Sequence, residues 1–142
     1  MTKRYQLLYT SRLLADITPA CVSQIVAVAR DRNRRNGIGS TLAFDGWRFC
    51  QYLEGTAADV CALAERIRTD RRHGDFRVLH HGACVGPTPL AGRSLMFALC
   101  YDASLVEIER VGGAQAVGLF ADRAHDFDLE PVDDDGRMTS DV

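Results

Sequence analysis

The sequence predicts an α+β fold of the ferredoxin-like βαββαββ kind, with a mixed sheet that carries two helices on one face. Short strand-like segments recur through residues 1–101, either alternating or continuously apolar. Two segments with helical spacing separate them, and a hairpin stands between these two helices. At 142 residues, the chain is long enough for one domain with a substantial core.

The first strand is expected over residues 5–11, where Tyr5, Leu7 and Tyr9 share one face. The first helix follows, with Thr18 as its N-cap and Pro19 at its first helical position. A buried tyrosine commonly bonds a backbone carbonyl, so Tyr9 alone carries little functional weight.

Asn33 extends the apolar stripe of this helix, which comprises Val22, Ile25, Val26 and Ala29. An inward-facing amide at the last turn either caps the helix end or contacts a ligand. Asn36-Gly37 already supplies a stop signal, which weakens the capping interpretation. Four basic residues crowd the same end and predict a solvated patch, with attraction for a nucleotide diphosphate as the alternative: Arg30, Arg32, Arg34 and Arg35.

Asp45-Gly46 predicts a two-residue type I′ turn between strands at 38–44 and 47–54. One face of the second strand should carry Trp47, Phe49, Gln51 and Leu53. Gln51 is the polar exception on this face. A buried primary amide needs partners for its two N–H donors and its carbonyl, so something polar should meet this face.

The second helix is expected over about 56–69, opened by the capping box Thr56-x-x-Asp59. Arg66, Asp70 and His73 follow one edge of this helix and its end. Without a ligand, Arg66 and Asp70 would form a surface ion pair, and His73 would complement the helix dipole.

The remaining strands are expected at 76–84 and 94–101, with a loop at 86–89 between them. These elements define a domain over 1–101. A C-terminal extension of two short helices is expected at 102–125, followed by an acidic, flexible tail at 126–142. The sheet face opposite the first two helices would expose side chains such as Leu8, so either a second copy of the chain or these last helices should cover it.

Composition excludes several classes of function. A net charge of −2 disfavours nucleic acid and anionic membranes as partners. No apolar run approaches the length of a membrane span, and no signal peptide is evident, so a cytoplasmic location is expected. The five cysteines have no metal-binding spacing, and no nucleophile–base pair stands out, so neither a metal site nor an enzyme is predicted.

Several individually unremarkable features stand in one order: Tyr9 late in the first strand, Asn33 at the end of the first helix, Gln51 in Phe-Cys-Gln-Tyr-Leu-Glu-Gly, and Arg66-x-x-x-Asp70-Arg-Arg-His73. In this order the chain resembles the BLUF family, blue-light sensors that use FAD. The resemblance covers about residues 4–101, and its most specific parts are Gln-Tyr-Leu-Glu-Gly and Asp-Arg-Arg-His.

The resemblance implies a flavin, FAD with FMN or riboflavin as alternatives, held between the two helices. It implies that Gln51 bridges Tyr9 and the flavin edge, and that Asn33 bonds the polar edge of the ring. Arg66, Asp70 and His73 would help to hold the cofactor. Blue light would drive electron and proton transfer from Tyr9, after which the Gln51 amide rearranges and signals to an unidentified protein partner.

Two segments depart from the family pattern. The chain has Ile38-Gly39-Ser40 where the family usually has Ile-Thr-Gly, and Arg93-Ser94-Leu95 where a Trp-Ser-Met segment usually relays the signal. Met96 comes one step later, which would place it on the opposite face of the strand. The alternative hypothesis is therefore an interaction module whose photochemistry is weakened or lost; a flavin enzyme ranks lower.

Overall fold

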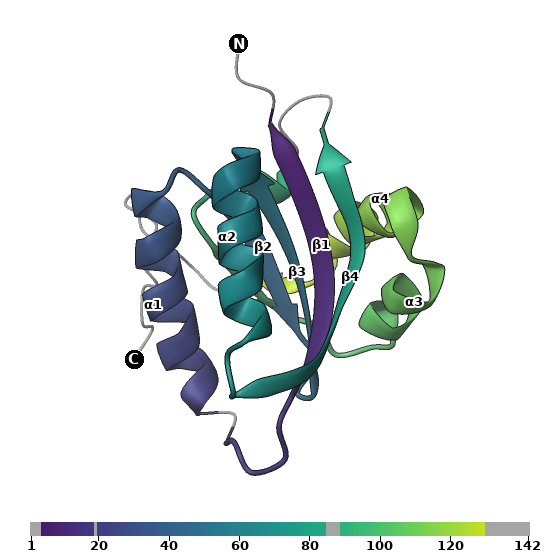
Figure 1. Ribbon diagram of the computed structural model, residues 1–142. Coiled ribbons are helices and arrows are strands. Elements are labelled where there is room, and N and C mark those ends of the chain that lie inside the picture. Colours follow the sequence, from purple (N-terminus) through teal and green to yellow (C-terminus); the bar gives the residue numbers. More distant parts are fainter. Residues whose placement is uncertain (1–3, 19, 85–88, 130–142) are drawn as a thin grey trace.

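The computed structural model describes residues 4–18, 20–84 and 89–129, and it has the expected ferredoxin-like α+β architecture (Figure 1). In chain order the elements are β1 (Tyr5–Leu13), α1 (Cys21–Arg35), β2 (Gly39–Phe44), β3 (Arg48–Gly55), α2 (Ala57–Arg68), β4 (His73–Ala83), a 3₁₀ helix (Pro89–Ala91), β5 (Met96–Leu99), α3 (Ser104–Val111), α4 (Gly113–Ala124) and β6 (Asp128–Leu129). The order βαββαββ is thus confirmed for the ferredoxin-like part.

The sheet has the strand order β4-β1-β3-β2-β5-β6 and is mixed, because β2 and β5 are parallel while the other pairs are antiparallel. β1 and β3 are therefore interior neighbours. Their register places Tyr9 directly opposite Gln51. Side chains of directly opposed residues project from the same face of a sheet, so these two residues meet.

Helices cover both faces of the sheet, α1 and α2 on one side and α3 and α4 on the other (Figure 1). Leu8 is fully buried in the cluster that contains Leu105, Ile108 and Phe120. The C-terminal helices α3 and α4, and not a second copy of the chain, therefore cover this face of the sheet. A homo-oligomer stays a prediction, and it no longer follows from an exposed Leu8.

The start of α1 differs from the prediction. The helix begins at Cys21, and its N-cap is Ala20, which has no side-chain cap. The backbone carbonyl of Thr18 instead accepts a hydrogen bond from the N–H of Cys21 at 3.0 Å. Thr18 therefore belongs to the preceding turn, and Pro19 lies outside the described residues.

The hairpin turn is shifted by one residue from the predicted Asp45-Gly46. Asp45 pairs with Arg48 through a 3.2 Å backbone hydrogen bond, so Gly46 and Trp47 are the central residues. Only Gly46 has a positive φ, at 95°, whereas a type I′ turn needs two. The Asp45 carboxylate accepts from the N–H groups of Trp47 and Arg48, which stabilises this alternative. Trp47 consequently leaves the strand and is 51% exposed.

The C-terminal part also differs from the prediction. The strand expected over 94–101 is confined to Met96–Leu99. The predicted tail begins at residue 126, yet Phe127 is buried against Phe120, and Asp128–Leu129 pairs with β5. Residues 130–142 and the predicted loop at 86–88 lie outside the described residues.

Candidate functional site

A cavity of about 180 Å³ opens between α1 and α2 above the centre of the sheet. It is lined by Tyr9, Ser11, Ile25, Ala29, Arg32, Asn33, Leu42, Phe49, Gln51, Leu63, Arg66, Ile67, Asp70, Arg72 and His73. This set includes every site residue proposed from the sequence. The apolar members suit a ligand with an apolar body, and the polar members supply hydrogen-bonding and charged groups to it.

Tyr9 and Gln51 form the polar centre of the cavity floor. They are 4% and 3% exposed, and the Tyr9 hydroxyl donates a 2.5 Å hydrogen bond to Oε1 of Gln51. Burial raises the pKa of Tyr9 far above its ordinary value, so this phenol stays protonated. Among the described residues, the Gln51 amide nitrogen has no hydrogen-bond partner, which leaves a donor at the cavity wall.

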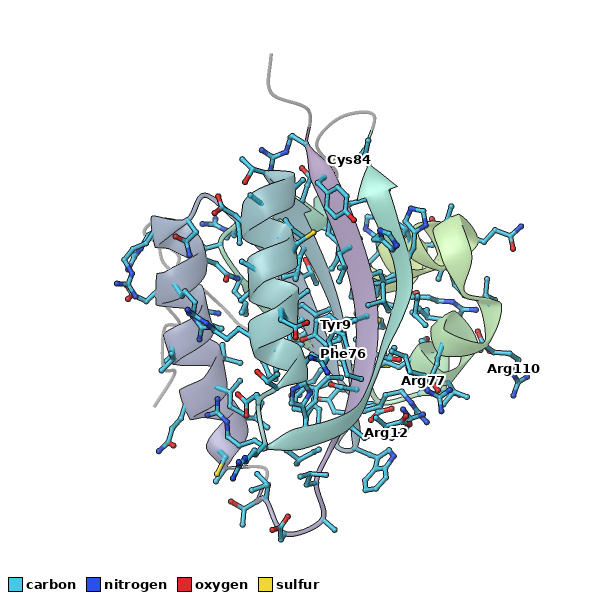
Figure 2. The ribbon with its side chains drawn as sticks, in the orientation of Figure 1. Tyr9, Arg12, Phe76, Arg77, Cys84 and Arg110 are labelled. Carbon is cyan, nitrogen blue, oxygen red and sulfur yellow. The ribbon has the colours of Figure 1, made fainter. Side chains whose placement is uncertain are left out.

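Phe76 supports Tyr9 from β4. The two ring centroids lie 4.7 Å apart with the planes tilted by 30°. Figure 2 shows both side chains on the side of the sheet that faces α2. This contact restricts the phenol ring and so helps to keep its hydroxyl aimed at Gln51.

Asn33 does not cap its helix with its side chain. Its Nδ2 donates to the Ser94 carbonyl at 2.8 Å and to Ser40 Oγ at 3.1 Å, so it ties α1 to β2 and to the segment before β5. Its Oδ1 is buried with no hydrogen-bond partner in the described structure. An unpaired buried acceptor is costly, so this oxygen points to a ligand that carries a donor.

Asp70 pairs with Arg72, not with Arg66 as the sequence suggested. The Arg72 guanidinium donates to both carboxylate oxygens, at 3.0 and 2.6 Å. This hydrogen bonding lowers the pKa of Asp70 to about 2. His73 hydrogen-bonds the carbonyl of Ile67 in the last turn of α2. Asp70 and His73 thus close the end of the cavity near β4.

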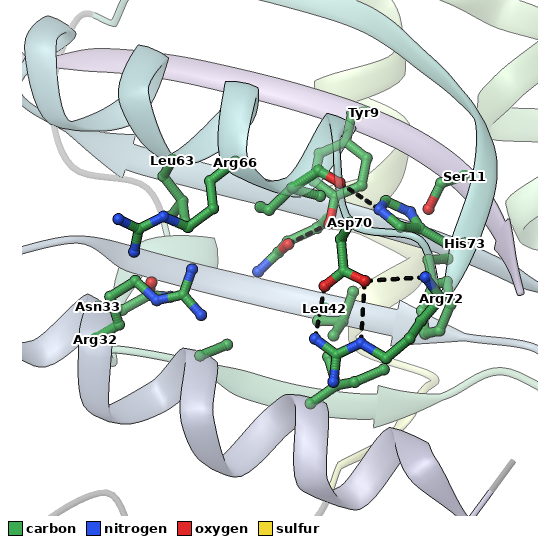
Figure 3. Close-up of a pocket in the computed structure, with 15 residues that line it drawn as sticks. Tyr9, Ser11, Arg32, Asn33, Leu42, Leu63, Arg66, Asp70, Arg72 and His73 are labelled. Carbon is green, nitrogen blue, oxygen red and sulfur yellow. Dashed lines mark hydrogen bonds and ion pairs between the residues drawn. The ribbon is translucent and has the colours of Figure 1, made fainter. Parts of the chain in front are cut away.

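Arg32 and Arg66 reach toward each other from α1 and α2 at the cavity edge (Figure 3). No described carboxylate lies within ion-pair distance of either guanidinium. Burial, followed by the positive charge of Arg66, lowers the pKa of Arg32. Two neighbouring cations without a carboxylate between them are suited to an anion.

Sequence reasoning did not single out Arg32 from the other arginines of α1. Ile25, Ala29 and Arg32 recur at helical spacing and together line the cavity, a signal that could have identified it. Arg30, by contrast, is buried and donates to the Leu95 carbonyl at 3.1 Å, so it does not join a solvated basic patch.

Ser11 was also missed. Its hydroxyl oxygen is buried without a described hydrogen-bond partner, and it lies two positions after Tyr9 on the same face. The described residues contain no group of three or more metal-binding side chains.

Leu95, just before β5, and Met96, the first residue of β5, project to opposite faces of the sheet. Leu95 is buried with Val26 on the α1 side, whereas Met96 lies beside Thr41 and Ala121 on the α4 side. The one-residue shift of Met96 relative to the family pattern therefore does place it on the other face.

Comparisons with known proteins identify related sequences and structures. A family model described as "BLUF: Sensors of blue-light using FAD" matches residues 5–86. The photoactivated adenylate cyclase subunit beta of Euglena gracilis is 32% identical over 87 residues, and so is that of Euglena longa. Each match covers 60% of this chain but only 10% of the relative, so the chain spans about a tenth of these relatives' length.

Solved structures give the same architecture. The dark-state structure of the BLUF protein BlrB is 26% identical with a TM-score of 0.72, over 87% of this chain and 96% of that one. BlsA in its photo-activated state is 22% identical with a TM-score of 0.71, over 84% of this chain and 93% of that one. A Klebsiella pneumoniae BlrP1 structure with FMN and cyclic diGMP is 22% identical with a TM-score of 0.64, over 85% of this chain and 35% of that one. The last two support the fold alone.

Proposed function

The chain belongs to the BLUF family of blue-light sensors that use FAD, and we propose that Tyr9 and Gln51 are its photoactive pair. The observation that carries this proposal is the buried 2.5 Å hydrogen bond from the Tyr9 hydroxyl to Gln51 on the cavity floor. No described side chains form a nucleophile–base pair in this cavity, and we propose a sensor, not a catalyst.

The residues suit a light-driven rearrangement. A bound flavin supplies the absorption of blue light and an acceptor for an electron. Tyr9 holds a neutral phenol whose proton already points to an oxygen of Gln51. The proton could therefore move along a formed hydrogen bond when the phenol gives up an electron to the acceptor that a flavin would supply. The amide of Gln51 carries a donor and an acceptor on one planar group, and rotation or tautomerisation exchanges them without creating charge.

The unpaired groups in the cavity fit the edge of a flavin. Asn33 Oδ1 is an acceptor without a described partner, and the Gln51 nitrogen is a donor without one. A ring edge that presents both donors and acceptors would satisfy them. Leu42 and Phe49 supply apolar surface from β2 and β3 for the ring. We propose that Tyr9, Asn33 and Gln51 bind this edge.

We propose that the charged residues of the cavity hold the rest of the cofactor. Arg66, with Arg32 opposite, would hold a phosphate of the flavin, which favours FAD or FMN over riboflavin. Asp70 and His73 would hold polar groups of the flavin side chain. Both FAD and FMN carry a phosphate, and FAD is proposed because the family is described by it.

The output of the sensor is proposed to be contact with a separate protein. The Euglena relatives are named as adenylate cyclases, but their match to this chain covers only a tenth of their length. Cyclase activity is therefore not transferred to this chain. No helix in the described residues is both long and apolar enough to cross a membrane. A homo-oligomer and a cytoplasmic location stay predictions.

One observation favours the second candidate, an interaction module without photochemistry. Arg93 and Leu95 occupy the positions where the resemblance leads one to expect a tryptophan and a methionine. Leucine and arginine carry neither the thioether of methionine nor the indole of tryptophan, the groups of the usual relay. Leu95 is buried in the core, and Arg93 is exposed.

An absorption experiment decides between the two candidates. The purified protein, supplied with FAD if necessary, should be yellow and should show a small reversible red shift under blue light. Gln51→Leu should keep the flavin and lose the shift. Yellow protein without any shift would favour the interaction module. Colourless protein that takes up no FAD would refute the photoreceptor.

A further inference from the structure

A charged cluster lies behind the Tyr9–Gln51 pair, on the sheet face covered by α3. It consists of Arg12 from β1, Arg48 from β3, Asp45 from the hairpin turn, Asp75 from β4 and Glu109 from α3. Figure 2 shows Arg12 on the α3 side of the sheet, while Tyr9 of the same strand lies on the α2 side. The cluster and the cavity therefore share β1 and β3 but use opposite faces.

Two like charges oppose each other in this cluster. Arg12 and Arg48 are direct cross-strand partners, three positions along from the Tyr9–Gln51 pair. Their side chains are only 18% and 14% exposed, so water screens them weakly. Like charges placed directly opposite in a sheet push the strands apart. Left alone, the two arginines would loosen β1 from β3.

Glu109 counteracts this repulsion. Its Oε1 accepts from Arg12 Nη2 at 2.6 Å, and its Oε2 lies 3.6 Å from Arg48 Nε. Asp75 pairs with Arg12 and Asp45 pairs with Arg48, but Glu109 is the only described carboxylate that contacts both arginines. One negative charge from α3 thus bridges two strands.

The bridge to Arg48 depends on charge. Glu109 Oε2 and Arg48 Nε are both buried without a described hydrogen-bond partner, and 3.6 Å is too long for a hydrogen bond. Burial alone would raise the pKa of Glu109, but the hydrogen bond from Arg12 and the two positive charges lower it. Neutralising Glu109 would therefore remove the attraction to Arg48 while changing little of the side-chain shape.

The backbone ladder between β1 and its other neighbour, β4, is less regular than the ladder between β1 and β3. Pairing between β1 and β4 shifts register between Leu8 and Tyr9 and again between Thr10 and Arg12. Asp75, at the second irregularity, has a positive φ of 52°. Tyr9 therefore lies between two irregularities of the β1–β4 ladder, whereas its pairing with β3 is regular.

We propose that Glu109 is a positioning residue for the photoactive pair. By holding Arg12 and Arg48 together from behind the sheet, it keeps β1 and β3 close enough for the short Tyr9–Gln51 hydrogen bond. The light-dependent consequence rests on the proposed function. The signal of Tyr9 in the dark can be measured whether or not light produces a red shift, so the two claims can be tested separately.

The test uses the whole 142-residue chain and four variants, one of which is Arg48→Gln alone. Glu109→Gln removes the charge at nearly constant shape. Glu107→Gln is the matched control, since Glu107 lies on the same helix and pairs with Arg123 at 2.8 Å on the exposed surface. The double variant Glu109→Gln with Arg48→Gln removes one of the two repelling arginines. The readouts are the NMR signal of ring-labelled Tyr9 without flavin, and the dark-recovery rate of the red-shifted state with FAD.

Glu109→Gln should shift the Tyr9 signal toward that of a weaker hydrogen bond and change the dark-recovery rate by about threefold or more. Glu107→Gln should match the wild type, and the double variant should return toward it. A folded Glu109→Gln protein with an unchanged Tyr9 signal would overturn the proposal, and so would a double variant no closer to the wild type than the single one.

If Glu109→Gln alone does not fold, the proposal is tested by comparing Arg48→Gln with the double variant. Without the second arginine, replacing Glu109 should leave the Tyr9 signal unchanged, and a shift there would contradict the proposal. If no variant shows a red shift in light, the photoreceptor function fails, while the Tyr9 signal still tests the position of the pair.

Discussion

Tyr9 and Gln51 face each other across β1 and β3, and the tyrosine hydroxyl donates to the amide oxygen over 2.5 Å. Both side chains are almost fully buried, so water does not compete for this hydrogen bond. The two residues come from distant parts of the sequence, but their strands are hydrogen-bonded neighbours inside the sheet. Their contact is therefore set by the register of the sheet.

Tyr9→Phe should abolish the light-induced red shift while flavin binding persists. The substitution removes the proton donor but keeps the ring that packs on Phe76. The loss of one buried hydrogen bond should lower the free energy of unfolding by about 1 kcal/mol. Difference absorption spectroscopy measures the shift. Tyr101→Phe is the control, because Tyr101 is 79% exposed. The red shift of this variant should equal that of the wild type.

Replacing both Arg32 and Arg66 with Gln should weaken the binding of FAD and FMN by about tenfold or more, because a charge-assisted contact contributes about 1.5–3 kcal/mol. Riboflavin carries no phosphate, so its affinity should stay nearly constant. Fluorescence titration with the three flavins measures this. Arg35→Gln controls for a general loss of charge, since Arg35 pairs with Asp31 on the exposed helix surface. An equal loss for riboflavin would contradict the assignment.

Asp70 should contribute stability that disappears in acid. Its pKa is lowered from 3.8 to about 2 by the hydrogen bonds from Arg72. Because the folded pKa is the lower one, the contribution is complete above pH about 4 and is lost as the pH falls toward 2. Asp70→Asn should therefore be less stable than the wild type at pH 7, by about 1 kcal/mol or less for this partly exposed pair.

Chemical denaturation at pH 7 and pH 3 measures this dependence on pH. The difference between wild type and Asp70→Asn should shrink at the lower pH. Asp31→Asn, on the exposed surface of α1, controls for loss of a surface carboxylate. A difference that stayed constant between the two pH values would show that Asp70 acts by packing instead of by its charge.

Gly39→Thr should destabilise the protein even though it restores the residue expected from the family pattern. A Cβ at Gly39 would lie 2.3 Å from the carbonyl oxygen of Ala91, so the 3₁₀ helix would have to move. Crowding of this kind costs about 1–3 kcal/mol. Thermal unfolding measures it. Gly118→Ala in α4 is the control, because no atom lies near its added Cβ, and it should be neutral or stabilising. Equal stability of Gly39→Thr and wild type would contradict the contact.

The sequence predicted the order of elements because periodicity and capping signals are local. Thr56 caps α2 and accepts from the Asp59 N–H at 3.2 Å, as the capping box required. The same local reasoning failed at two boundaries. A side-chain acceptor on Asp45 moved the hairpin turn by one residue, and α1 began after Thr18 instead of at it.

The sequence by itself determined the order of the elements and identified six of the residues that line the cavity, since the spacing of apolar and polar residues decides which face each one occupies. Only the tertiary structure decided which side chains form ion pairs and which elements pack on each other. Asp70 pairs with Arg72 instead of Arg66, α3 and α4 cover the second sheet face, and Glu109 reaches two arginines from another element. Alternative ion pairs on a protein surface differ by about 1 kcal/mol or less, so the local sequence does not select Arg72 over Arg66, and Glu109 meets its arginines only because the fold brings α3 to β1 and β3.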